Sequence, residues 1–415
     1  MTQPALSARP CWSPCNTPSL AALAGLLIGL ASLPFAAFGL AQLATTAVAQ
    51  LHGPAHVTDF VAISSGPGLL LSDPSHLYAP GAAAALDRSL TATDRFDRPF
   101  SFLPHAAMEL APLGLLPYGV AYLIWLGIGL ASVAMSAWML APRSRLWPLV
   151  LLLFLPPQLA LIMGQTSAVT LLAFCALVRL IDRRPRLAGV LVGLSPATWK
   201  PQLVAPALAI ALAAGRQWRA LMWVMLGPLV LVAAFTGVAG IGWVADYRAQ
   251  ASAMWSLVND RSSVESAGQT LLGLAQAAFG PGWAAVLVAV GVGAAIDSAL
   301  AAVWWRGLRR DARRHLQLAL LPIAAVTAAP HALGYDLTLW LASAWLLLRY
   351  VECRPAARPV VLALSLSGWA CANVIVLTEN ELGFPWAAVH GLATIVAIVW
   401  LYVSHHPRQA LVDHG

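Results

Sequence analysis

Long apolar runs recur along almost the whole chain of 415 residues, and they constrain its fold more than any motif does. Apolar residues make up 60% of the sequence and charged residues only 10%, against about 25% charged residues in an ordinary globular protein. A soluble protein of this length could not cover its surface with so few charges, and a disordered chain would be far less apolar. The sequence therefore excludes a soluble enzyme and predicts an all-α polytopic membrane protein.

Twelve apolar runs are candidate spans, because a helix needs about 20 residues to cross a bilayer. No soluble domain is visible, so we expect a single integral membrane domain over residues 1–415. The runs are 19–42, 117–141, 146–162, 165–181, 187–199, 201–215, 220–240, 283–305, 316–329, 334–349, 359–377 and 384–403.

The basic residues predict how these spans are oriented. With a cytoplasmic N-terminus, 18 of the 24 Lys and Arg residues fall on the inner side, as the positive-inside rule requires. They sit in short groups between apolar runs, which indicates membrane orientation and not nucleic-acid binding. We expect a plasma (inner) membrane protein with cytoplasmic tails at 1–18 and 404–415 and extracytoplasmic segments at 43–116 and 241–282.

Two features depart from a plain helical bundle. The first extracytoplasmic loop, 43–116, is long enough to be functional, and its stretch from Ala106 to Leu116 is apolar enough to form a short interfacial helix. The runs 187–199 and 201–215 are too short for two full crossings, since each covers only some 20 Å. The turn between them should therefore lie at the floor of an outward cavity.

Ionisable side chains in such a chain are candidates for a functional site, because they are costly in lipid. Asp59 lies at an expected helix start in the first loop, where it could be a simple N-cap. Thr58 could cap that helix instead, which would leave Asp59 for chemistry. Gln165, at the outer turn between the third and fourth spans, is either a polar helix start or an amide that contacts a sugar or phosphate.

Lys200 is the sharpest candidate, because it is the only lysine in the chain and lies at the tip of the broken helix pair, beside Gln202. An ammonium there suits a phosphate as a point charge, although a lysine at the interface can also snorkel. His331 could donate to a phosphate or pack as a structural histidine. Tyr335 and Asp336 follow it in the same outer turn.

These residues come from separate segments that the topology places on one side of the membrane. A carboxylate and a cationic cluster in one outward cavity suit group transfer from an anionic, membrane-borne substrate. Asp59, Asp73 and Asp336 could ligate a divalent metal, but nothing in their spacing demands one, so we expect no required cofactor.

Four short motifs, in this order and placement, resemble glycosyltransferase family 87, which comprises polytopic enzymes of the GT-C class. The resemblance covers about residues 20–350. The motifs are Asp59-Phe60, Gly164-Gln165, the run from Leu187-Ala188-Gly189 to Trp199-Lys200-Pro201-Gln202, and the run from Pro330-His331 to Tyr335-Asp336.

The resemblance implies a GT-C bundle and inverting transfer of a hexose, with mannose favoured, from a polyprenyl-phosphate donor to a hydroxyl of a lipid-linked or glycan acceptor. It implies that Asp59 is the catalytic base and that Lys200 and His331 hold the donor phosphate. Gln165, Gln202, Tyr335 and Asp336 would then contact substrate. The reaction would take place on the extracytoplasmic (periplasmic) side, with membrane lipids as the surroundings and no nucleic acid as partner.

One departure and one rival prediction stand beside this interpretation. Relatives often carry a Tyr-Pro-Pro-like element before the second span, where this chain has Phe102-Leu103-Pro104-His105, so we expect different acceptor contacts. Twelve spans with a broken helix pair are also typical of a lipid or sugar transporter or flippase. Against a transporter, the ionisable residues lie toward the outer face, and no two-fold repeat is visible.

Overall fold

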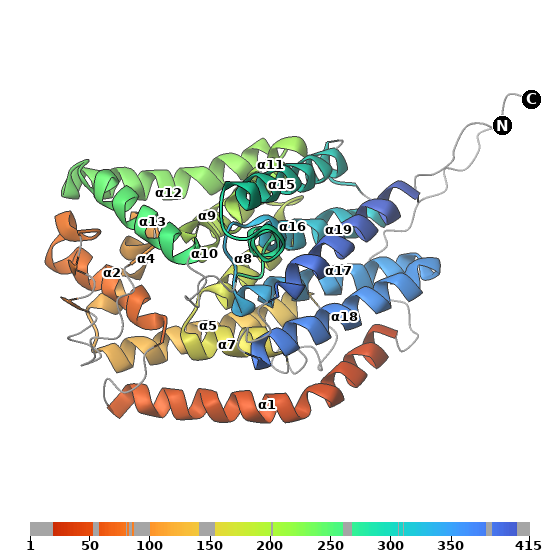
Figure 1. Cartoon of the computed structure of the whole chain (residues 1–415), viewed down its shortest axis with the longest axis horizontal. Helices are drawn as coiled ribbons and strands as arrows, with labels where there is room; N and C mark the ends of the chain where they lie inside the picture. Colours follow the sequence, from red (N-terminus) through yellow and green to blue (C-terminus); the bar gives the residue numbers. More distant parts are fainter. Residues whose placement is uncertain are drawn as a thin grey trace, which may run out of the picture.

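Every element in the described part of the computed structural model is a helix, which confirms the predicted all-α class (Figure 1). The two predicted cytoplasmic tails and part of the first loop lie outside the described residues, apart from Ser404, which ends the last helix. The structure describes residues 20–52, 58–79, 81–82, 85–86, 100–140, 154–200, 202–259, 268–305, 307–309, 311–378 and 384–404.

The five helices between residues 155 and 214 are short, with 4 to 14 residues each. The described helices are α1 Leu20–His52, α2 Phe60–Ser72, η1 Pro74–His76, α4 Pro104–Gly114, α5 Tyr118–Leu140, α7 Leu155–Met163, α8 Ser167–Leu180, α9 Pro185–Gly193, α10 Pro196–Trp199, α11 Ala205–Ala214, α12 Trp218–Ala239, α13 Trp243–Asn259, α14 Leu271–Phe279, α15 Trp283–Trp304, α16 Arg313–Ala328, η3 Gly334–Leu339, α17 Trp340–Cys353, η4 Pro355–Ala357, α18 Arg358–Leu377 and α19 Trp386–Ser404.

Five of the described helices are long and apolar enough to cross a membrane: α5, α12, α15, η4 with α18, and α19. Two of them, α12 and α15, bury little of their apolar surface inside the protein and leave side chains such as Leu229, Trp283 and Val290 exposed. Apolar surface of this extent is stable in lipid and not in water. The exposed faces of these helices therefore indicate contact with lipid.

The predicted count of twelve spans is not confirmed. Several of the predicted runs form helices shorter than a crossing, including α7, α9 and α11, which have 9, 9 and 10 residues. Where the sequence ends its first run near residue 42, α1 continues to His52, because the apolar pattern is followed by good helix formers without a break. α4 covers most of the predicted interfacial stretch of the first loop, and its depth in a membrane stays a prediction.

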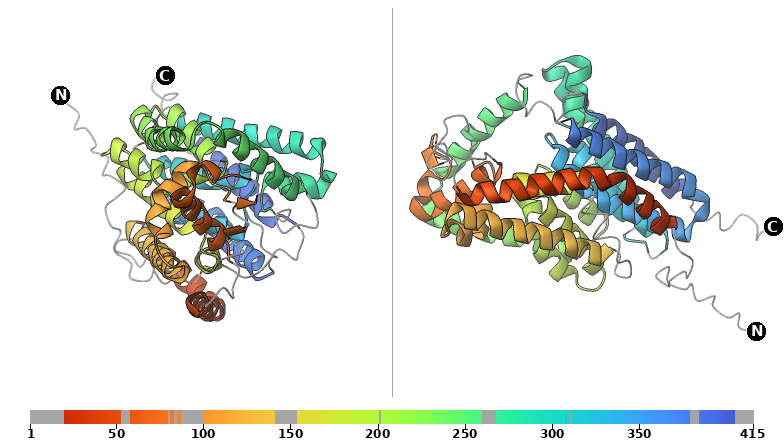
Figure 2. Two further views of the ribbon diagram at one scale, coloured as in Figure 1. Left: turned by 90° about the vertical axis from the view of Figure 1, so that its left-hand side faces the viewer. Right: turned by 90° about the horizontal axis from the view of Figure 1, so that it is seen from below.

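Helices from the two long segments that the sequence assigns to the outer side, 43–116 and 241–282, share one end of the bundle. α2, α4 and α13 lie together at one end (Figures 1 and 2). Among the segments predicted to be inside, an ion pair joins Arg314 to Asp182, and Arg309 Nε donates to Tyr402 Oη at 3.3 Å near the end of α19. The grouping of loops along the chain is thus consistent with the predicted alternation of sides.

Two buried clusters frame the space where the site lies. The larger one surrounds α16, which is buried along its length and packs against α11, α15, α17 and α19. The smaller one joins α2, α4 and α5, and α1 lies along the outside, against α5 and α7 (Figure 2). Ile63 and Phe102 of the smaller cluster line the cavity described below, together with residues that follow α16.

Candidate active site

A cavity of about 340 Å³ lies where α2, α13 and η3 come together. All seven residues that the sequence singles out line this one cavity, although they belong to segments far apart in the chain. The sequence thus identified residues that the fold brings together, and the role of each stays a prediction at this point. They are Asp59, Gln165, Lys200, Gln202, His331, Tyr335 and Asp336.

Asp59 occupies the N-cap position of α2, but its side chain makes no capping hydrogen bond. Instead, its Oδ2 accepts a hydrogen bond of 2.8 Å from Gln165 Nε2. Thr58, the alternative cap, does not cap either, since no partner for its buried hydroxyl is found among the described residues. The interpretation of Asp59 as a helix cap is therefore wrong, and Asp59 is one of the residues that line the cavity.

Gln165 reaches Asp59 because of the turn that joins α7 to α8. Gly164 ends α7 with φ at +69°, a left-handed conformation that favours glycine. A Cβ at Gly164 would lie 2.5 Å from Phe60 Cβ, so the absence of a side chain lets the turn pack directly on the first residue of α2. The indole of Trp125 donates to Gly164 O at 2.7 Å and holds the turn in place.

Lys200 follows α10, a single turn whose first residue is Pro196 and whose N-cap, Ser195, accepts a hydrogen bond from Ala197 N. Its Nζ donates to Gln165 Oε1 at 3.1 Å and lies 5.2 Å from the ring centroid of Tyr335. The ammonium is thus directed into the cavity, and the interpretation of Lys200 as a snorkelling lysine is not supported. Asp59, Gln165 and Lys200 form one continuous chain of hydrogen bonds.

The turn that carries Lys200 is held by the first-loop helix α4. Trp199 is buried, and its Nε1 donates to Glu109 Oε2 at 3.0 Å. His105 Nε2 and Thr198 Oγ1 lie 3.1 Å apart in a second buried contact between the two helices. Burial raises the pKa of Glu109 to about 7, because the charged form of a carboxylate is disfavoured away from water.

Asp336 and His331 enter the cavity from the segment between α16 and α17. The carboxylate of Asp336 accepts from Ser167 Oγ at 2.8 Å and from Leu333 N at 3.1 Å, so it ties η3 to the start of α8. These bonds give Asp336 a structural function beside the predicted contact with substrate. His331 lies on a stretch whose backbone is fixed by Gln269 N, which donates to Ala332 O at 2.8 Å.

The family model of glycosyltransferase family 87 matches residues 100–330, more than half of the chain. The chain belongs to glycosyltransferase family 87. Neither a curated protein nor a solved structure matches it. Family membership makes the chain a membrane glycosyltransferase with a sugar donor and an acceptor, and the transporter prediction is therefore not carried further. The match includes Gln165, Lys200 and Gln202, while Asp59 precedes it and His331, Tyr335 and Asp336 follow it.

One wall of the cavity in this glycosyltransferase was not predicted from the sequence. Tyr247, Gln250 and Trp255 of α13 line it, and Gln250 Nε2 donates to Phe100 O at 2.7 Å. The segment 241–282 was expected to be a loop, yet it contains the 17-residue helix α13. The spacing of these three residues, which places them on one helix face, is the signal that could have identified them.

The residues described do not include any group of three or more His, Cys, Asp or Glu side chains placed to hold a metal ion. Of the three carboxylates considered from the sequence, Asp59 and Asp336 line the cavity. Asp73 is at the other end of α2 and accepts hydrogen bonds from Ser75 Oγ and His76 Nδ1, so the three do not gather at one place.

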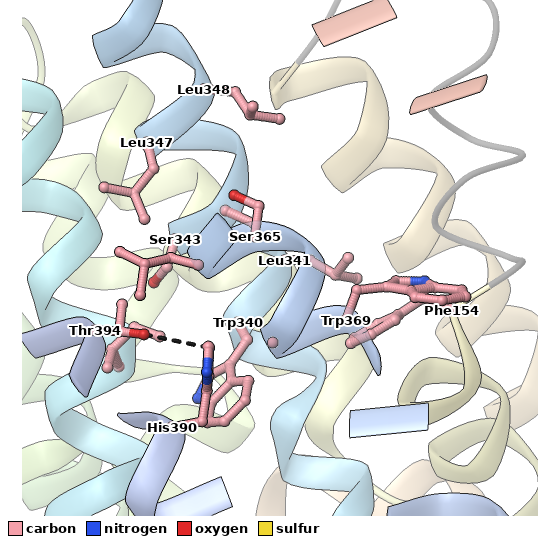
Figure 3. A pocket seen from close by; sticks show the side chains of 14 residues that line it. Phe154, Trp340, Leu341, Ser343, Leu347, Leu348, Ser365, Trp369, His390 and Thr394 are labelled. Carbon is pink, nitrogen blue, oxygen red and sulfur yellow. Dashed lines mark hydrogen bonds between the residues drawn. The ribbon is translucent and has the colours of Figure 1, made fainter. Parts of the chain in front are cut away.

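A second cavity, of about 70 Å³, lies between α17, α18 and α19 and is lined almost entirely by apolar groups (Figure 3). Trp340 and His390 stand side by side in it, with ring centroids 5.0 Å apart, and Thr394 Oγ1 and His390 Nε2 lie 3.2 Å apart. Trp340, which lines this second cavity, directly follows η3, the short helix that contains Tyr335 and Asp336.

We expect Gly164→Ala to destabilise this glycosyltransferase by about 1–3 kcal/mol and to reduce its activity. An added Cβ would be strained at this φ and would push the α7–α8 turn off Phe60, which separates Gln165 from Asp59. Thermal unfolding and transfer rate in detergent measure both effects. Gly127→Ala is the matched control, because a Cβ there meets nothing within 4 Å. Equal behaviour of the two variants would contradict the assigned function of the turn.

We expect a pH-dependent stability that disappears in Glu109→Gln. The pKa of Glu109 is raised from 4.5 to about 7, so the folded state binds the proton more tightly. This stabilisation is complete below pH 4.5 and is lost as the pH rises through about 7. The glutamine keeps an acceptor for Trp199 Nε1 and should show a flatter unfolding temperature between about pH 5 and about pH 8.

The matched control for Glu109→Gln is Glu352→Gln, at an exposed carboxylate that pairs with Arg349 at the other end of the bundle. That variant should keep the pH dependence of the wild-type protein in this range. The assignment is wrong if both variants retain the same dependence, because another group would then be responsible for it.

Proposed function

We propose that this enzyme transfers a hexose, with mannose favoured, from a polyprenyl-phosphate donor to a hydroxyl of a lipid-linked or glycan acceptor, with inversion. The observation that carries the proposal is the hydrogen-bonded chain of Asp59, Gln165 and Lys200 along one cavity wall. A base for the incoming hydroxyl and a cation for the departing phosphate are the two groups that such a transfer needs.

In the proposed reaction, Asp59 accepts the proton of the acceptor hydroxyl as its oxygen attacks the anomeric carbon. The bond from that carbon to the phosphate oxygen breaks on the opposite face, and its electron pair leaves with the polyprenyl phosphate. A single displacement without a covalent enzyme intermediate inverts the anomeric centre, by analogy with inverting glycosidases. The phosphate leaves as an anion, so no acid is needed to protonate it.

Lys200 and His331 are proposed to bind the donor phosphate. An ammonium has three N–H groups, and Gln165 takes one of them, so the others can donate to phosphate oxygens. Interactions of this kind are strongest in a site that excludes water, where charge develops against fixed donors. Gln202, Tyr335 and Asp336 complete this side of the cavity and are proposed to contact the sugar or the phosphate.

A polyprenyl chain needs apolar surroundings, and the lipid-facing surfaces of α12 and α15 support a donor that is carried by such a chain. The face of α13 that lines the catalytic cavity supports a contact with the sugar or the acceptor. Tyr247 and Trp255 supply aromatic surface there, and the Gln250 amide is held against Phe100. Rigid aromatic groups with a polar end are typical of such binding surfaces.

We propose that the reaction occurs on the extracytoplasmic side of the plasma membrane, with both termini in the cytoplasm. The distribution of Lys and Arg along the chain supports this orientation, because most of them fall in the alternate segments opposite to the cavity. The proposed reaction uses no metal ion, and addition of a chelator to the assay tests this directly.

We expect Asp59→Asn to lower transfer at least 100-fold, since a general base contributes about 10²–10⁴-fold. The asparagine amide can still pair with Gln165, so folding and donor binding should remain nearly intact. The measurement is transfer of labelled mannose from polyprenyl-phosphate mannose in proteoliposomes, with donor binding followed separately. Asp73→Asn, at an exposed carboxylate on the other end of α2, should stay within about twofold of wild type. Wild-type turnover in Asp59→Asn would remove Asp59 as the base.

We expect Lys200→Met to raise the KM for the donor by roughly 10- to 100-fold, the range for a lost hydrogen bond to a charged group. Lys200→Arg should recover part of this loss, because the charge is kept but the guanidinium fork differs in shape from an ammonium. The KM for the acceptor serves as the internal control and should change little. If neither variant alters donor KM or turnover, the assignment of the phosphate site is wrong.

A further inference from the structure

We propose that Gln165 is a positioning residue that orients the catalytic carboxylate of Asp59 and couples it to Lys200. This inference rests on the proposed function of the same cavity, and it assigns Gln165 a different role from the substrate contact expected from the sequence. The carrying observation is that both polar atoms of one buried amide are engaged by the two charged groups.

The orientation of the amide is fixed by the chemistry of its neighbours. An ammonium can only donate and an ionised carboxylate can only accept, so Oε1 must face Lys200 and Nε2 must face Asp59. The observed distances, 3.1 Å to Lys200 Nζ and 2.8 Å to Asp59 Oδ2, agree with this assignment. In a flipped amide, Nε2 would face the ammonium of Lys200, a donor, and Oε1 would face the carboxylate of Asp59, an acceptor. That orientation is therefore excluded while both groups are charged.

The backbone of Gln165 is as firmly held as its side chain. Gln165 N donates to Ala160 O at 2.6 Å, which closes the C-terminal turn of α7. Gly164, the preceding residue, is fixed by its bond from Trp125 and by contact with Phe60. An amide on such a support keeps the Asp59 carboxylate in one orientation without rearrangement during the reaction, which is the condition for efficient general-base catalysis.

A carboxylate in place of the amide is the sharpest test, because Gln165→Glu changes one NH₂ group to an oxygen. The variant keeps an acceptor for Lys200 but sets two carboxylates against each other, and such a pair binds a shared proton. We expect kcat near neutral pH to fall by about tenfold and to recover partly as the pH rises and that proton is lost. The donor KM should stay within about threefold, since Lys200 keeps its partner.

The pH profile must be compared with a variant that adds the same charge elsewhere in the cavity. Lys200, His331 and Asp336 face the cavity from other elements and are the same in both variants, so the comparison controls for them. Gln202→Glu adds a carboxylate to the same cavity, but Gln165 is the residue that donates a hydrogen bond to Asp59, so the Gln202 variant should not show the recovery at alkaline pH. The inference is overturned if both variants share the recovery, or if Gln165→Glu has an unchanged profile with a raised KM.

Gln165→Met provides the second route if the glutamate variant does not fold. It removes both hydrogen bonds without adding charge, and we expect a fall in kcat of about tenfold with donor KM within about threefold. A raised KM at unchanged kcat would make Gln165 a substrate contact and would overturn the inference. Failure of the proposed function is distinguishable, because the wild-type protein would then transfer no sugar from polyprenyl phosphate and Asp59→Asn would make no difference.

Discussion

The contact between Gly164 and Phe60 is the point on which the arrangement of the cavity depends. It brings the α7–α8 turn against the start of α2, and it is close enough that a single Cβ would not fit. Asp59 and Gln165 are 106 residues apart in the chain, yet the residues next to them make this contact. The left-handed turn at Gly164 then directs the following side chain toward the carboxylate. A local property of one glycine thus assembles groups from two distant segments.

The site is built from short helices, and a lipid environment limits where such helices are stable. Backbone groups at a helix end need partners when water is absent, so irregular backbone at depth is stable only against protein or a polar cavity. α9, α10 and α11 satisfy this condition, because their ends pack on α4, α8 and α16 and their connecting turn faces the cavity. The first-loop helix α4 supplies a partly buried carboxylate for the indole of Trp199, which fixes the turn that carries Lys200. Long helices such as α12 and α15 instead expose apolar surface to lipid.

The sequence predicted the members of the site better than their contacts. Ionisable and amide groups are rare in such an apolar chain, so a short list of them already contained seven of the residues that line the cavity. The sequence could not reveal that Gln165 bridges Asp59 and Lys200, because the hydrogen-bond partners of an amide are known only from the three-dimensional structure. The pairing of Glu109 with Trp199 was missed for the same reason, whereas the wall formed by α13 was missed because the segment 241–282 was expected to be a loop. Helix lengths were also poorly predicted, since α1 continues past the expected end of its run and α7 and α9 are shorter than their runs.

The choice of lysine at position 200 follows from the geometry around it. Every other basic residue in the chain is Arg, so Lys200 is not explained by the general composition. Its ammonium lies 5.2 Å and 5.7 Å from the ring centroids of Tyr335 and Phe102 and donates to Gln165. A planar guanidinium needs partners on two parallel N–H groups, whereas an ammonium is compact and can direct its remaining N–H groups toward a phosphate that shifts as its bond breaks. In the proposed reaction, the lone lysine is therefore the cation best matched to a leaving group whose charge grows during transfer.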